Sequence, residues 1–145
     1  HRPTRSCFDP DAVSKVVGGA RPVPIPSLET GPDPQGFGWL ESLWATIADR
    51  AANRPAGSYT TTLLEGGVDL AGRKVAEEAT EVLLAAKNDA SAQSTGTDRG
   101  TTRSLLAGEA GDLLYHALVL LAERGMEPRA VLDVLRHRHG DLTPA

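Results

Sequence analysis

Apolar positions recur at helical spacing over most of the chain. Leu40, Leu43, Trp44, Ile47 and Ala51 follow one another at steps of three and four residues, which gives one apolar face to a helix over about 38–52. Similar patterns predict a short helical turn over 61–67 and helices over about 69–87, 102–124 and 128–137. No segment sustains a two-residue alternation. We therefore expect an all-α fold, a bundle of four to five helices.

The same spacing predicts which side of each helix faces inward. The expected inward residues are Val75, Ala79, Val82, Leu83 and Ala86, then Leu106, Ala110, Leu113, Leu114, Ala117 and Leu121, and finally Val131, Val134 and Leu135. Tyr115 and Leu118 lie off the stripe of the 102–124 helix. Because a helix that is apolar on more than one side needs a second partner, we expect a homodimer or higher homo-oligomer.

Two segments lack the helical pattern. Residues 1–36 hold seven of the ten prolines, which predicts an irregular Pro-rich N-terminal segment ahead of a helical domain over 37–140 and a tail over 141–145. Residues 88–100 are rich in Ser, Thr, Asp and Gly. That composition predicts a mobile loop between two long helices.

Composition narrows the function classes. The 145-residue chain has a net charge of −4, so it offers no basic field to a nucleic-acid backbone. Its single cysteine, Cys7, excludes an intrachain disulfide and fits a reducing compartment. No stretch approaches the roughly 20 apolar residues of a membrane span, and a basic n-region followed by an apolar one is missing. We expect a cytoplasmic protein with neither nucleic acid nor membrane as partner.

Four acidic residues form two similar pairs, each with its members three residues apart on one predicted helix. At about 100° per residue, Glu78 lies about 60° from the apolar stripe of its helix, and Glu81 about 120° to the same side. Glu109 and Asp112 repeat these positions on the later helix. Carboxylates that face one space repel one another unless a cation neutralises them, and all-oxygen ligands suit Mg²⁺ or Mn²⁺. For any single glutamate the alternative is a solvated surface charge.

Three neighbouring residues leave alternatives open. Glu77 lies nearly opposite the stripe, where pairing with Arg73 is preferred to a role as ligand. Lys74 either contacts phosphate or pairs with Glu78. His116, one turn past Asp112, either orients a metal-bound water or is a capped histidine of the bundle, and we favour the latter.

These residues carry a resemblance to a known family. Glu77-Glu78-x-x-Glu81 followed by Glu109-x-x-Asp112 resembles the signature of the all-α nucleoside triphosphate pyrophosphatases, which include MazG-like enzymes and dimeric dUTPases. RPAGSYT at 54–60, KVAEEATE at 74–81 and EAGDLLYH at 109–116 resemble the phosphoribosyl-ATP pyrophosphatases of histidine biosynthesis, over about residues 37–138.

The resemblance implies a metal-dependent hydrolysis of phosphoribosyl-ATP to phosphoribosyl-AMP and pyrophosphate. The implied metal ligands are Glu78, Glu81, Glu109 and Asp112, with Glu78 and Glu81 also catalytic. The implied substrate-binding residues are Arg54, Gly57, Ser58, Tyr59, Thr60 and Lys74, with Glu77 and His116 in support. The alternative for the 54–60 loop is an ordinary turn before a helix. The alternative functions are a MazG-like house-cleaning pyrophosphatase and, outside enzymes, a helical dimerisation module.

The first residues carry a second, shorter resemblance. HRPTRSCF at 1–8 is similar to the end of phosphoribosyl-AMP cyclohydrolase, the enzyme of the next step. This implies a chain cut or descended from a bifunctional protein. We expect from it neither cyclohydrolase activity nor bound zinc, because the rest of that enzyme is absent.

Overall fold

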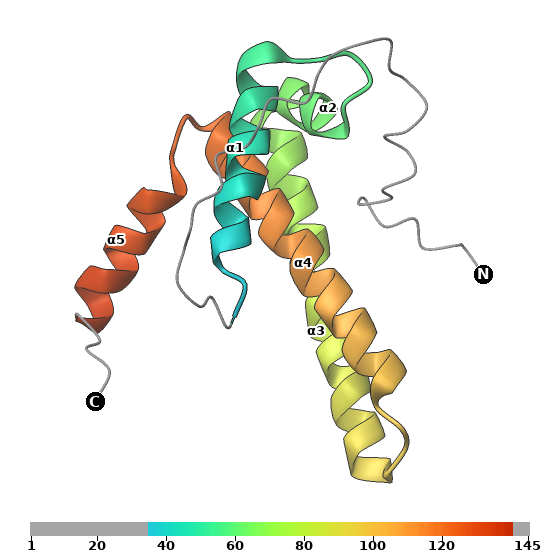
Figure 1. Ribbon diagram of the computed structural model, residues 1–145. Helices are drawn as coiled ribbons and strands as arrows, with labels where there is room; N and C mark the ends of the chain where they lie inside the picture. The colour runs from blue at the N-terminus through green and yellow to red at the C-terminus, as the bar shows by residue number, and fades with distance from the viewer. Residues whose placement is uncertain (1–34, 141–145) are drawn as a thin grey trace.

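A computed structural model describes residues 35–140, and within them the chain is helical and contains no strand. The five helices are α1 (Gly38–Asn53), α2 (Tyr59–Glu65), α3 (Gly67–Thr95), α4 (Gly100–Glu123) and α5 (Pro128–His139). Helices α3 and α4 form a long antiparallel hairpin, and α1 and α2 pack at the end opposite its tip (Figure 1). The all-α prediction is confirmed.

The hydrophobic core lies at the end of the hairpin that α1 and α2 cover. Its buried residues come from three helices: Leu43 and Ile47 of α1, Leu63 and Leu64 of α2, and Tyr115, Leu118 and Val119 of α4. The face predicted for α1 is confirmed, because Leu40, Trp44 and Ala51 pack against the same cluster. The outer half of the hairpin therefore extends beyond the main core.

The loop predicted over 88–100 is wrong. Helix α3 continues to Thr95 and ends at Gly96, whose φ of 68° is the left-handed conformation that commonly terminates helices. Only residues 96–99 separate α3 from α4. The polar residues remain helical because Thr95 bonds back to the Ser91 carbonyl at 3.0 Å and because Asp89 is buried against α4.

The inward face predicted for α3 is also wrong. The buried residues are Ala71, Glu78, Ala85 and Ala92, spaced seven apart, together with Asp89. The large aliphatic residues face outward instead, Leu83 being 57 % exposed. Because alanine side chains are small, α4 can approach α3 closely. The seam between the two helices therefore consists of small and acidic side chains, which a pattern of large apolar residues does not reveal.

Helix α4 differs from its prediction in the same way. Tyr115, His116, Leu118 and Val119 are buried, whereas Leu114 of the expected stripe is 43 % exposed. The partner that Tyr115 and Leu118 require is supplied within the chain by α1 and α2. The surplus apolar surface of α4 therefore lies on the opposite side from the one predicted.

Helix α5 stands apart from the rest of the bundle (Figure 1) and buries none of its residues. Pro128 at its first turn and the basic residues of its last turn match the expected helix signals. Val131, Val134 and Leu135 were expected inward but are more than 40 % exposed. Periodicity thus predicts that α5 has an apolar face but not what that face contacts.

Among the described helices, α4 alone is long and apolar enough to cross a membrane by length and composition. The expectation that no stretch approaches such a span is corrected to that extent. Core helices of soluble bundles pass the same test, and α4 carries Glu109 and Asp112 in its middle, where a bilayer disfavours carboxylates.

Candidate functional site

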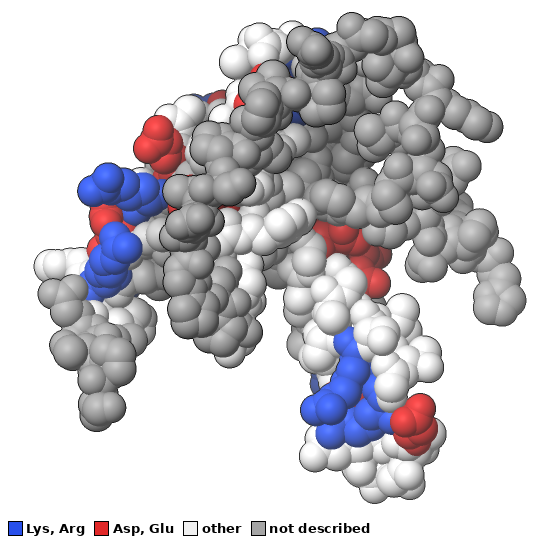
Figure 2. Space-filling view, viewed as in Figure 1, with Lys and Arg blue, Asp and Glu red and all other residues white. Residues whose placement is uncertain are grey.

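Three carboxylates converge where the hairpin meets the α1–α2 end. Glu78 of α3 and Glu109 and Asp112 of α4 each offer an oxygen, and these three oxygens lie within 4.8 Å of one another. Figure 2 shows acidic side chains gathered beside the upper part of the hairpin. Glu109 and Asp112 share a side of α4 because they are three residues apart, and the antiparallel packing brings Glu78 opposite them.

Glu78 is the buried member of this acidic cluster, at 4 % exposed. Lys74 Nζ lies 2.8 Å from Glu78 Oε1 and 2.9 Å from Glu77 Oε2, so the predicted Lys74–Glu78 ion pair is present. Glu77 itself lies on the outside of the helix, where Arg73 also reaches it at 3.6 Å. The single ammonium of Lys74 pairs with two carboxylates, and no ion pair to Glu109 or Asp112 is present among the described residues.

The pKa shifts of the site residues reflect this excess of negative charge. Burial raises the pKa of Asp112, and the nearby Glu78 charge raises it further. Burial also raises the pKa of Glu109, followed by the charge of Glu81. Burial alone would lower the pKa of Lys74, but hydrogen bonds with Glu78 and Glu77 outweigh it and raise that pKa. The acidic cluster therefore holds more negative charge than the surrounding side chains neutralise.

His116 is a buried bundle histidine with both ring nitrogens occupied. Its Nδ1 lies 2.8 Å from the carbonyl oxygen of Asp112, and its Nε2 lies 3.1 Å from Tyr59 Oη. Because a carbonyl can only accept, Nδ1 carries the hydrogen, and in the neutral ring Nε2 accepts the Tyr59 hydroxyl. Nδ1 is also 3.6 Å from Glu78 Oε1. His116 thus fixes the turn of α4 that carries Asp112 and links it to Tyr59.

The 54–60 segment, which was predicted as a loop and whose last two residues begin α2, is held by hydrogen bonds within the chain. Ser58 Oγ caps α2 by accepting the Thr61 amide at 3.3 Å, and Thr60 Oγ1 lies 2.7 Å from Tyr115 Oη. Gly57 has a φ of 77°, which glycine adopts without strain. Arg54 adopts a φ of 45°, the only positive value among the described non-glycine residues, and donates Nε to the Ala51 carbonyl. The ordinary-turn alternative accounts for these contacts, and substrate binding by this loop stays a prediction.

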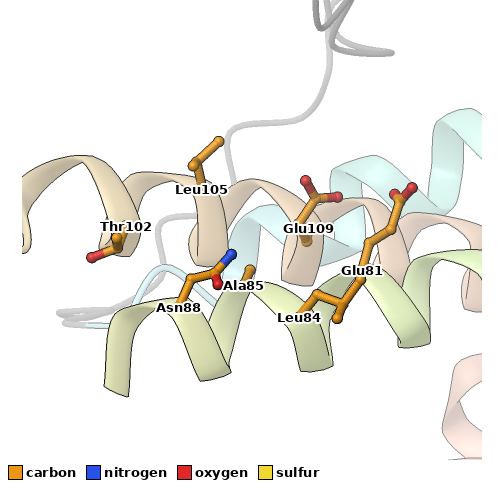
Figure 3. A pocket seen from close by; sticks show the side chains of 7 residues that line it. All are labelled: Glu81, Leu84, Ala85, Asn88, Thr102, Leu105 and Glu109. Carbon is orange, nitrogen blue, oxygen red and sulfur yellow. The ribbon is translucent and has the colours of Figure 1, made fainter. Parts of the chain in front are cut away.

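Glu81 lies outside the group of three but beside Glu109. Both residues line a groove between α3 and α4, and Figure 3 shows their carboxylates side by side at one end of it. From the helical spacing we predicted that Glu78 and Glu81, on the same side of their helix, both hold the metal. The structure separates them, because Glu78 is central to the buried face of α3 and Glu81 is exposed at its edge.

The groove contains residues that the sequence analysis missed. Asn88, Thr102 and Leu105 line it; the sequence pattern predicts Asn88 in the 88–100 loop and Thr102 at the start of the 102–124 helix, and it singles out none of the three as a site residue. Asn88 follows Glu81 by seven residues, so a longer helix would have placed the two on one face. The missed signal is the absence of any glycine or proline between Gly72 and Gly96.

A second acidic centre lies near the tip of the hairpin. Asp89 accepts Arg99 Nε at 3.0 Å and Thr102 Oγ1 at 2.9 Å, and Arg99 Nη2 bonds its other oxygen. The hydrogen bond from Arg99 is the main reason that the pKa of Asp89 falls to about 2. This carboxylate is fully paired within the chain.

Comparison with known proteins identifies the family. The family model described as phosphoribosyl-ATP pyrophosphohydrolase matches residues 40–139. The chain belongs to this family. The resemblance carried by the acidic motifs is confirmed, and the helical dimerisation module is set aside because the family is one of hydrolases.

The names of individual relatives agree with this family assignment. The phosphoribosyl-ATP pyrophosphatase of Rhodopirellula baltica is 44 % identical over 101 residues, which cover 70 % of this chain and 77 % of the relative. The histidine biosynthesis bifunctional protein HisIE of Bacillus subtilis is 44 % identical over 106 residues, covering 73 % of this chain and 45 % of the relative. HisIE of Halalkalibacterium halodurans is 40 % identical over 139 residues, covering 96 % of this chain and 54 % of the relative.

The chain spans about half the length of these bifunctional relatives. The predicted cyclohydrolase-like segment at 1–8, the 141–145 tail and all of the Pro-rich segment over 1–36 except residues 35 and 36 lie outside the described residues. The assignment of these segments stays a prediction.

Proposed function

We propose that this chain hydrolyses phosphoribosyl-ATP to phosphoribosyl-AMP and pyrophosphate, in histidine biosynthesis, with Mg²⁺ or Mn²⁺ as cofactor. The observation that carries the proposal is the group of three carboxylate oxygens, from two adjacent helices, within 4.8 Å of one another. The names of the relatives support the substrate. The three residues of this group, Glu78, Glu109 and Asp112, belong to the acidic motifs that carry the resemblance. The geometry and the names of the relatives therefore support the same site.

The acidic cluster fits a hard divalent cation. Its donors are all carboxylate oxygens, it has unneutralised negative charge, and burial and mutual repulsion raise the pKa of Asp112 and Glu109. Glu78, Glu109 and Asp112 would hold the ion, with Glu81 adjacent. A bound cation would neutralise these carboxylates and polarise the phosphoryl oxygens of the substrate.

The chain's own residues divide the remaining work. The Lys74 ion pair fixes the Glu78 carboxylate, and His116 fixes the backbone at Asp112. Glu81 is exposed, lies beside Glu109 and has no ion-pair partner among the described residues. We assign Glu81 as the group that accepts the proton of the attacking water. That water forms a new bond to phosphorus in line with the anhydride oxygen, and pyrophosphate leaves.

The proposal includes a homodimer or higher homo-oligomer in the cytoplasm. Support for the assembly comes from apolar surface that the chain leaves exposed: Leu83 on α3, Leu114 on α4, and the Val131, Leu132, Val134 and Leu135 face of α5. Patches of this kind commonly mark contacts between proteins. The single cysteine and the acidic net charge support a reducing compartment and a nucleotide, rather than nucleic acid, as partner.

The deciding experiment measures pyrophosphate release, with Mg²⁺ present, from phosphoribosyl-ATP beside a panel of ordinary and deoxy-nucleoside triphosphates. We expect kcat/KM for phosphoribosyl-ATP to exceed that for every panel member. A preference for deoxy-nucleotides would instead favour the MazG-like house-cleaning activity.

The matched variants are Glu78→Gln, which removes one charge from the acidic cluster, and Asp69→Asn, which removes an exposed carboxylate from the first turn of the same helix. We expect the first to abolish turnover without loss of helical circular dichroism and the second to behave as the unchanged protein. Near-normal turnover by Glu78→Gln would overturn the metal assignment.

A further inference from the structure

We infer that the groove between α3 and α4 holds the purine ring of phosphoribosyl-ATP and that Asn88 reads the polar edge of that ring. This inference rests on the proposed function. It adds a specificity-determining residue outside the acidic motifs, in a segment that the sequence alone assigned to a loop.

The groove has the dimensions and lining of a site for one ring. Its volume is about 230 Å³, below the roughly 300–1,000 Å³ of pockets that enclose a whole drug-sized ligand. The seven lining residues are Glu81, Leu84, Ala85, Asn88, Thr102, Leu105 and Glu109. Leucine and alanine side chains provide an apolar surface for a flat aromatic ring, and polar groups lie only toward the ends.

The groove is continuous with the acidic cluster. Glu81 and Glu109 line one end of it, and Glu109 is also one of the three converging carboxylates. Figure 3 shows these two carboxylates at one end and Asn88 and Thr102 toward the other. A nucleotide whose phosphates are at the carboxylate end therefore extends its base along the groove toward Asn88.

Asn88 is the polar group available to that base. Its side chain extends toward α4 in Figure 3 and has no hydrogen-bond partner among the described residues. Thr102 is already engaged, because its hydroxyl donates to Asp89 at 2.9 Å. A carboxamide both donates and accepts, and it matches the acceptor N7 and the adjacent N6 of an adenine ring. Asn88 is thus the residue that would select an adenine ring over a base that lacks this pair of hydrogen-bonding groups.

The Asp89 centre keeps the groove in shape. Thr102 Oγ1 and Arg99 tie α4 to Asp89 of α3 at the groove's far end. Because Asp89 directly follows Asn88, the same contacts fix the helical turn from which Asn88 extends. Asp89 acts here as a positioning residue and does not touch the substrate.

The test is Asn88→Leu, a change of similar size at an exposed helical position, where leucine favours the helix more than asparagine. Steady-state kinetics with phosphoribosyl-ATP should show KM raised about tenfold with kcat nearly unchanged, because the lost contact is made equally in ground and transition states. Mn²⁺ titration should give unchanged affinity. Gln93→Leu, the same kind of change on an exposed position of α3 outside the groove, should leave every parameter unchanged.

Each other outcome overturns a different statement. An unchanged KM in Asn88→Leu, with the parent chain active, overturns the groove assignment alone. Weakened Mn²⁺ binding with lower kcat would make Asn88 part of the metal site. A change in oligomeric mass by light scattering, with KM unchanged, would make the groove an interface between copies. A parent chain inactive toward phosphoribosyl-ATP overturns the proposed function and this inference with it.

Discussion

The two ends of the α3–α4 hairpin each bury a carboxylate in the seam, and they treat it in opposite ways. Near the tip, Asp89 receives a guanidinium and a hydroxyl, and its pKa falls to about 2. Near the core, Glu78 shares Lys74 with Glu77 and faces two further carboxylates, and burial helps raise the pKa of Asp112. The charge of Asp89 is balanced within the chain by Arg99, whereas the acidic cluster keeps negative charge that the proposed cation would balance. Under the proposed function, incomplete neutralisation, rather than burial, distinguishes the metal site from a structural ion pair.

The strongest way to break this comparison is Asp112→Asn. If the acidic cluster binds the catalytic cation, the loss of one ligand removes several kcal/mol of transition-state stabilisation, which is about a thousandfold in turnover. The melting temperature of the metal-free protein should rise, since one repelling charge is gone. Pyrophosphate release and thermal melting in chelator measure both effects. A fall in the metal-free melting temperature would show that Asp112 contributes to the fold in the way that Asp89 does.

Asp89→Asn makes the matched change at the other end. It replaces a charge-assisted pair with a neutral contact and leaves Arg99 without its partner carboxylate. We expect the melting temperature to fall by several degrees with or without metal, whereas Mn²⁺ affinity stays the same. A loss of Mn²⁺ affinity would contradict the separation of the two centres.

The two ends should also respond oppositely to pH. Asp89 has a lowered pKa, so its contribution to stability is full above its unfolded value of about 3.9 and is lost as pH falls toward about 2. Asp112 has a raised pKa, so the metal-free fold binds more protons than the unfolded chain and gains stability as pH falls from neutrality toward about 4.

Denaturant melts across this range, in chelator, resolve the two contributions. Asp112→Asn should flatten the gain between neutrality and pH about 4, and Asp89→Asn should flatten the loss below it. An identical pH profile for the parent chain and both variants would show that neither carboxylate is perturbed as described.

The smallest expected effect comes from a neutral hydrogen bond near the core. Tyr115→Phe removes the hydroxyl that lies 2.7 Å from Thr60 Oγ1 and keeps the ring in the hydrophobic cluster. The free energy of unfolding should fall by about 1 kcal/mol, with little change in turnover. Urea unfolding gives the stability directly. A large loss of turnover would assign Tyr115 to the substrate site rather than to the support of α2.

The sequence predicted that each helix exists, but it predicted the length of α3 and the contacts of α3, α4 and α5 poorly. Leu43 and Ile47 of α1 face the core as their spacing requires, because α1 has one apolar face. Helix α3 has two faces of different kinds, one of exposed leucines and one of buried alanines and acids. A pattern based on large apolar residues selects the face of exposed leucines. It therefore predicts Glu78 beside the inward face, although Glu78 lies at the centre of the face that packs against α4.

The candidate site was predictable to the extent that it depends on local spacing. Glu109 and Asp112 are neighbours on any helix, and their convergence with Glu78 requires only that two such helices pack together. The groove and Asn88 depend on the length of α3 and on its register with α4. Neither can be obtained from composition when a helix continues through a segment rich in serine and aspartate.

The seven-residue spacing of the α3 seam has a consequence for how such a chain can change. Ala71, Ala85 and Ala92 show what the seam accepts where only packing matters, and Glu78 occupies the equivalent position in their series. An alanine there would complete the series and relieve the repulsion, yet it would remove a member of the acidic cluster. Stability of the metal-free fold and the proposed chemistry therefore make opposite demands on this one position.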